Sequence, residues 1–265
     1  MRKLSLDAFT LKLIAIISMA LSHTSVVFWE IVPIWLHIPL YAIRGITFPI
    51  MAFFLTEGFR RTSNIKRYML RLLIFALIAQ IPYMLVMEFF TLNIIFTILL
   101  GLICLLLHDK LCVKAQKRGL FAVIFAALLI GLLVTNLVEG GPLGPLMIFL
   151  FHVIKDEKKR RTIPLICWGA MMILSNFLTR VAVVFADAAV FADAQGPAMQ
   201  VELLMIPFYV FSVGSFAVIP LLRAYNGERG RRAKFLFYAF YPAHLAVLAI
   251  AAYTLGFTDF PALNL

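Results

Sequence analysis

Two ionisable residues, Lys12 and His23, stand inside the first apolar segment of the chain, Leu11 to Trp29. An α-helix turns 100° per residue, so the step between them comes within about 20° of three full turns. Both side chains are therefore expected on one helix face, roughly 16 Å apart along the axis. Because an imidazole in lipid is costly, such a residue usually faces a bundle interior or a water-filled cavity. The pair predicts a general base reached from one side of a membrane and supplied from the other. A histidine that only hydrogen-bonds a neighbouring helix fits this pair equally well.

Three further polar residues lie within apolar segments. Arg44 is placed near the outer end of the second segment, where a guanidinium suits an anion or a carbonyl that develops negative charge, or simply reaches the outer headgroups. His244 lies near the middle of the last segment, beside Pro242, and is either functional or a hydrogen-bonded histidine of the bundle. Asn93 shares a face with Thr97 at the outer end of the fourth segment, a pattern also typical of contacts between helices.

The composition predicts an all-α, polytopic transmembrane bundle. Of the 265 residues, 63% are hydrophobic and 14% are charged, whereas about a quarter of the residues of a soluble domain are charged. Continuous apolar runs such as Leu120 to Val134 argue against a transmembrane β-barrel, whose segments alternate. We expect one domain, residues 1–265, with nine spans near residues 10–29, 38–57, 69–89, 92–108, 119–136, 142–154, 162–180, 201–222 and 234–255. The sixth span is short for a full crossing.

The net charge of +11 is explained by membrane topology and not by nucleic-acid binding. Of 24 basic residues, only Arg44 and Arg180 do not fit the side on which the spans place the N-terminus. This asymmetry predicts a cytoplasmic N-terminus, an outer C-terminus and contact with anionic lipid headgroups. The three cysteines show no metal-binding spacing, so no metal is expected.

Several segments together resemble the TraX family of membrane proteins, named for the acetylase of conjugative F-type pilin. They are LKLIAIISMALSH, RGITFPIMAFFLTEGF, YMLRLLIFALIAQIPY, LNIIFTILLGL, GPLGPLMIFLF and PLLRAYNGERGRRAKFLFYAFYPAHL. The order and spacing of the segments carry the resemblance, which runs nearly end to end. Two residues depart from the family pattern, since Ser22 and Gln80 stand where the family often has carboxylates.

The resemblance implies an acyltransferase of the bacterial cytoplasmic membrane. The family is similar to acyltransferase-three enzymes, in which a basic residue, ten intervening residues and a histidine mark the first span, as Lys12 and His23 do here. Acetyl-CoA or another cytoplasmic acyl-CoA would then donate its acyl group to an acceptor on the outer side, a peptide amine, a glycan or a lipid headgroup. His23 would be the general base, and Arg44, Asn93 or His244 would stabilise the oxyanion or orient the acceptor.

The phosphates of CoA predict a cationic binding site on the cytoplasmic side. The expected residues are Lys12, Arg60, Arg61, Arg229, Arg231 and Arg232. Two rival functions remain open. Buried histidine and arginine would also serve a proton-coupled transporter of small molecules. A non-catalytic membrane assembly factor would need neither the base nor the donor site.

Overall fold

The computed structural model describes residues 5–28, 31–87, 91–190 and 210–257, and within them the chain is helical apart from loops and isolated bridges. Its longer elements are α1 (Ala8–Val27), α2 (Ile34–Arg61), α3 (Ile65–Met87), α4 (Ile94–His108), α5 (Arg118–Thr135), α6 (Leu143–Val153), α8 (Ile163–Val190) and α11 (Lys234–Thr254). The shorter ones are the π-helix η1 (Asp109–Lys114), α7 (Glu157–Arg160), η2 (Ser215–Ala217) and α10 (Val218–Arg223).

Seven helices among the described residues are long and apolar enough to cross a membrane, which confirms the all-α, multi-pass prediction. The predicted short span at 142–154 is the 11-residue helix α6. The predicted span at 201–222 lies partly outside the described residues, and only the helical stretch Val210–Arg223 can be placed. The total of nine spans and the sidedness of the two termini stay predictions.

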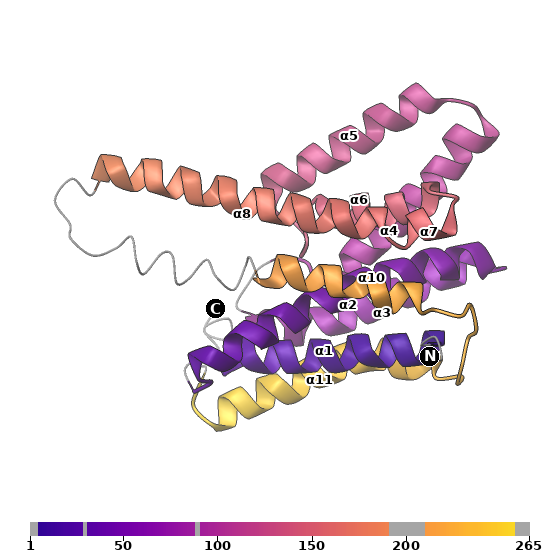
Figure 1. Cartoon of the computed structure of the whole chain (residues 1–265). Coiled ribbons are helices and arrows are strands. Elements are labelled where there is room, and N and C mark those ends of the chain that lie inside the picture. Colours follow the sequence, from indigo (N-terminus) through magenta and orange to yellow (C-terminus); the bar gives the residue numbers. More distant parts are fainter. Residues whose placement is uncertain (1–4, 29–30, 88–90, 191–209, 258–265) are drawn as a thin grey trace.

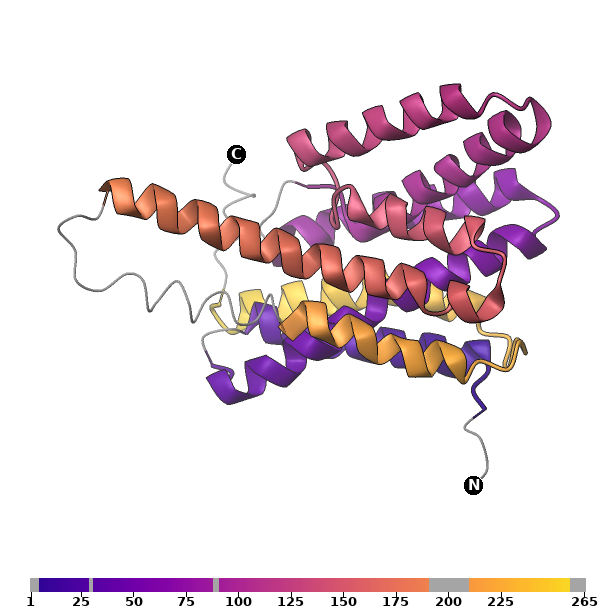
Figure 2. The same cartoon turned by 45° about the horizontal axis from the view of Figure 1, so that its top comes forward.

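Four helices, α1, α2, α3 and α11, form the part of the bundle that matters for the site (Figure 1). Helix α1 packs along α2, and α11 packs along α3 and α1. Helix α5 stands apart in both Figure 1 and Figure 2 and buries only Phe121 and Leu132. The remaining side chains of α5 leave an apolar surface suited to lipid.

Polar caps and glycines fix how these helices begin and pack. Asp7 caps α1 by accepting a 2.7 Å hydrogen bond from the Thr10 amide, which satisfies a donor that a helix start leaves unpaired. Gly45 of α2 and Gly214 approach each other's segments so closely that a Cβ on Gly214 would overlap the Ala42 carbonyl. Glycine at these positions lets α2 pack backbone to backbone against the stretch Val210–Arg223.

The basic connections lie at one end of the bundle, on the right in Figure 1, where α1, α3, α5 and α11 begin and α2 and α10 end. We call this the basic end. Because the charge pattern predicts that these connections are cytoplasmic, the basic end is the expected cytoplasmic end.

Candidate functional site

One cavity of about 660 Å³ runs along the inside of the bundle from the basic end into the opposite half. Lys12 and Arg231 line it at the basic end, whereas His23, Arg44 and Glu139 line it in the other half, which we call the histidine end. Apolar and aromatic side chains such as Phe48 line the stretch between. The cavity thus joins the two groups of residues that the sequence singled out.

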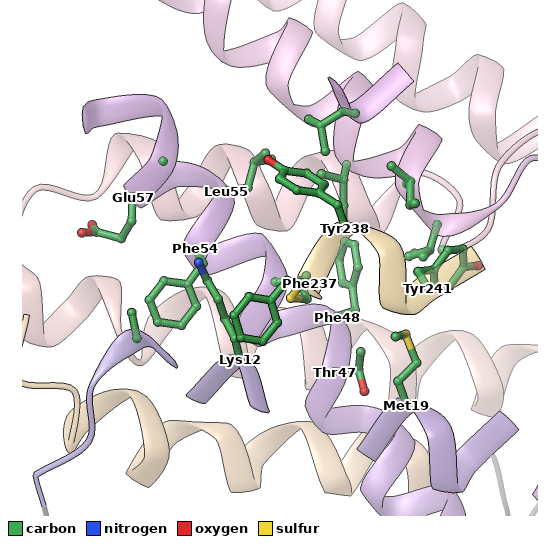
Figure 3. A pocket seen from close by; sticks show the side chains of 18 of the residues that line it. Lys12, Met19, Thr47, Phe48, Phe54, Leu55, Glu57, Phe237, Tyr238 and Tyr241 are labelled. Atoms are coloured by element: carbon green, nitrogen blue, oxygen red, sulfur yellow. The ribbon is translucent and has the colours of Figure 1, made fainter. Parts of the chain in front are cut away.

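Lys12 is held in the cavity between two aromatic rings. Its Nζ atom lies 4.9 Å from the ring centre of Phe54 and 5.6 Å from that of Phe237 (Figure 3). Rings at this distance attract a cation without neutralising it. In the described part of the chain no carboxylate pairs with Lys12, and its charge is therefore available to an anion in the cavity.

A loop docked on the start of α1 brings Arg229 and Arg231 to the same end of the cavity. The Leu6 amide donates to the Ala224 carbonyl at 2.9 Å, and the Asn226 amide donates back to the Leu6 carbonyl at 2.9 Å. These bonds tie the segment after α10 to the chain just before α1. Neither arginine forms an ion pair within the described residues, so both side chains keep their full charge at the cavity.

The other three arginines predicted for the donor site differ in what they contact. Arg61 lines the cavity but pairs with Glu57 at 2.9 Å. Arg60 is turned away, where its guanidinium donates to the His152 carbonyl at 3.0 Å. Arg232 is exposed and does not line the cavity. The structure therefore does not bring Arg60 and Arg232 to the cavity, because adjacent residues of a helix or loop point in different directions.

Glu57 anchors the basic end of α2. Both terminal nitrogens of the buried Arg160 guanidinium bind Glu57 Oε1 at 2.8 Å, a geometry that fixes the carboxylate. Arg160 also pairs with Glu157 at 2.9 Å. This network connects α2 with α7 and holds the wall of the cavity in place.

At the histidine end, His23 of α1 and His244 of α11 are in direct contact. The distance from His23 Nδ1 to His244 Nε2 is 2.8 Å, and His244 Nδ1 lies 2.8 Å from the Phe240 carbonyl oxygen. A carbonyl can only accept, so His244 Nδ1 carries the hydrogen and, in a neutral ring, Nε2 accepts. His23 Nδ1 must then donate to it. This chain of hydrogen bonds leaves the lone pair on His23 Nε2.

His23 is in a position to use that lone pair. The residue is buried in the protein and lines the cavity, and none of the described residues hydrogen-bonds its Nε2 atom. His244 does not line the cavity and stands behind His23. The arrangement suits a base whose tautomer is set by a second imidazole.

Arg44 forms an ion pair with Glu139 in the lining of the cavity, with 3.8 Å between the guanidinium Nη2 and the carboxylate Oε1. Glu139 lies between α5 and α6, where its amide donates to the Leu92 carbonyl at 2.8 Å and its own carbonyl accepts from the Thr97 hydroxyl. Burial raises the pKa of the Glu139 carboxyl, and the nearby Arg44 opposes that shift. The carboxylate oxygen Oε2 is buried without a partner among the described residues.

Asn93 does not belong to this group. Its side chain accepts from the Ile95 amide at 3.0 Å, capping α4, and donates to the Ala76 carbonyl at 2.8 Å and to Gln80 at 2.9 Å. It is fully buried and does not line the cavity. All of its polar atoms are engaged in joining α3 to α4, so it is not placed to stabilise an oxyanion.

A separate cluster lies outside the cavity. Asp109 Oδ1 is 2.9 Å from His152 Nε2 and 3.1 Å from His108 Nδ1, so one carboxylate connects the end of α4 with α6. Such a set of groups could hold a metal ion. Hydrogen bonds from the two histidines to the Asp109 carboxylate also explain why these three side chains lie together. The expected absence of a metal therefore stays a prediction.

Sequence reasoning assigned no functional role to two cavity residues, Glu139 and Arg71. Glu139 follows the fifth span in a turn, where an acidic residue usually meets water. Arg71 belongs to a basic connection, where orientation alone explains the charge. A signal for Glu139 was the need of Arg44 for a carboxylate partner.

The fold and the cavity define a multi-pass α-helical membrane protein whose bundle encloses a cavity with charged residues toward both ends. A family model described as "TraX protein" matches residues 7–252, and the chain belongs to the TraX family. It is also 28% identical over 268 residues to the "Probable fimbrial assembly protein FimC, serogroup H1" of Dichelobacter nodosus, covering 94% of this chain and 97% of that protein. No solved structure matches the chain significantly.

Proposed function

We propose that this protein transfers an acyl group, most simply acetyl, from a cytoplasmic acyl-CoA to an amine or hydroxyl on the other side of the bacterial cytoplasmic membrane. The observation that carries the proposal is the single cavity that joins cations without carboxylate partners to the free lone pair of His23. A CoA thioester has the matching shape, with phosphates at one end of a long arm and the reactive carbonyl at the other.

The dimensions agree with this pose. Lys12 and His23 are separated by roughly 16 Å along α1 at 1.5 Å per residue. Phosphates held near Lys12, Arg229 and Arg231 would let the pantetheine arm extend along the apolar middle of the cavity. The thioester carbonyl would then reach His23 without leaving the bundle.

The chemistry follows from the hydrogen-bond chain. His23 Nε2 takes the proton of the attacking amine or hydroxyl while that nucleophile bonds to the thioester carbon. Arg44 lines the cavity at the histidine end. Its guanidinium stabilises the negative oxygen of the tetrahedral intermediate. The C–S bond then breaks, and the CoA thiolate takes the proton back from His23. The products are the acylated acceptor and CoA–SH, with no net proton change on the protein.

The same continuous cavity would also serve a transporter, so the experiment must separate the two functions. Acetyl-CoA binding and slow thioester cleavage, with water as acceptor, are measured on purified wild type and His23→Ala. Acyl transfer predicts that the variant binds acetyl-CoA normally and loses about 10²–10⁴-fold in cleavage rate. His37→Ala is the matched control, because His37 is a buried histidine outside the cavity lining.

Absence of both binding and cleavage in folded wild type would contradict the proposal and favour the transporter. Cleavage that persists in His23→Ala would remove the assigned base. The fimbrial role in the name of the Dichelobacter protein leaves a third function, a non-catalytic assembly factor, for which His23→Ala would leave assembly intact.

A further inference from the structure

Arg71 lies on the wall of the cavity at the basic end, in the second turn of α3. Its Nε atom is buried and has no hydrogen-bond partner among the described residues. It forms no ion pair with a carboxylate in the described part of the chain, unlike Arg61, which binds Glu57. Because no carboxylate neutralises it, this guanidinium keeps its charge for an anion in the cavity.

Two tyrosines hold this guanidinium in place. Its carbon lies 5.8 Å from the ring centre of Tyr68, one turn earlier on α3, and it interacts with the Tyr238 hydroxyl of α11. Tyr238 is itself fixed by stacking on Phe75, with ring centres 5.4 Å apart. Tyr68 and Tyr238 both line the cavity. The three side chains therefore form a rigid group with two hydroxyls and one cation.

Close packing behind Tyr68 supports a fixed geometry. A Cβ atom at Gly58 of α2 would lie 3.0 Å from the Tyr68 hydroxyl oxygen, so the glycine gives the phenol its room. Arg67, one turn before Arg71 on the same helix, is exposed and does not line the cavity. Membrane orientation explains Arg67, but it does not explain a cation directed into the bundle.

We propose that Arg71, Tyr68 and Tyr238 form a phosphate subsite in the cavity that Lys12 and Arg229 also line, and that this subsite takes the diphosphate of a nucleotide-linked thioester. This inference rests on the proposed function and deepens it, because it distinguishes a CoA thioester from a donor without phosphates. The planar guanidinium binds two phosphate oxygens at once, whereas the tyrosine hydroxyls donate to others.

The test compares two donors on purified protein. Acetyl-CoA carries the diphosphate, and acetyl-pantetheine has the same thioester and arm without phosphates. We expect Arg71→Ala to lower the apparent second-order rate of thioester cleavage about tenfold or more with acetyl-CoA, the loss of one charge-assisted contact, and to leave acetyl-pantetheine unchanged. Arg71→Lys should recover only part of the loss, since an ammonium cannot bind two oxygens side by side. Arg67→Ala, which removes the same charge from the same helix, should change neither donor.

A second probe separates this inference from the proposed function. Binding of inorganic pyrophosphate that weakens in Arg71→Ala and not in Arg67→Ala would support the subsite even if the protein cleaved no thioester. Equal losses with both donors, or no loss with acetyl-CoA, would overturn the subsite while leaving the acyltransferase proposal standing. Unchanged melting temperatures would show that the variants are folded.

Discussion

The two ends of the cavity differ in how their charges are balanced. At the basic end, Lys12, Arg229 and Arg231 have no carboxylate partners in the described part of the chain. At the histidine end, Arg44 faces Glu139, and the two imidazoles satisfy one another as neutral rings. A surplus of positive charge suits the binding of an anion, whereas a balanced site suits proton transfer. Under the proposed function, the basic end would bind the donor and the histidine end would carry out the chemistry.

After replacement of His23 itself, replacement of His244 is expected to change thioester cleavage most. His244→Ala removes the acceptor that fixes the His23 tautomer, so thioester cleavage should fall by roughly 10–100-fold, the range seen when a partner that orients a metal-bound imidazole is removed. Acetyl-CoA binding should not change, because the basic end is untouched. Steady-state rates and a binding isotherm on the same preparation check this. An unchanged rate would show that the His23–His244 hydrogen bond has no part in the reaction.

Two adjacent arginines, Arg231 and Arg232, test the role of the basic end. Arg231→Ala should weaken acetyl-CoA binding about tenfold, because it removes a cation that lines the cavity. Arg232→Ala changes the net charge equally but alters a side chain outside the cavity, so its affinity should match wild type. Isothermal titration at two salt concentrations measures both. Equal losses would mean that general surface charge, and not the cavity, attracts the donor.

The pairing at the histidine end explains why sequence reasoning reached only part of the site. The helical step from Lys12 to His23 is local, and the structure places both residues in the cavity. The contact with His244 joins residues 221 positions apart, so only the packing of α1 on α11 creates it. Local pattern also cannot say which way a side chain in a loop points, and Arg231 and Arg232 differ for that reason alone.

Asn93 shows the same limit from the opposite side. A polar residue in an apolar segment could be catalytic or could join helices, and its hydrogen bonds to α3 decide for the second role. The all-α fold and the long helices, by contrast, follow from apolar run length, which needs no tertiary information.

Asn93→Ala should therefore act on stability and not on catalysis. It removes a helix cap worth about 0.5–2 kcal/mol and the side-chain hydrogen bonds to Ala76 and Gln80 of α3. The melting temperature in detergent should fall, and kcat per folded molecule should stay within about twofold of wild type. A loss of kcat without a change in melting temperature would return Asn93 to the catalytic group.

The smallest expected effect is a pH dependence carried by Glu139. Burial raises the pKa of this carboxyl in the folded protein. At pH values just above the ordinary pKa of glutamate, the folded state therefore binds more protons than the unfolded state. Its contribution to stability therefore declines as pH rises from about 4.5 toward the raised value. Glu139→Gln should flatten that part of the profile of melting temperature against pH. A profile identical to wild type would place the carboxylate in contact with water.

The most direct test of the division between the two ends is the kinetic cycle of His23→Ala, Arg231→Ala and the double variant on acetyl-CoA cleavage. We expect Arg231→Ala chiefly to raise KM and His23→Ala chiefly to lower kcat. The double variant should combine both losses within about twofold, as for distant sites that act independently. Loss of acetyl-CoA binding in His23→Ala, or a double variant no less active than the less active single variant, would contradict a division between the two ends.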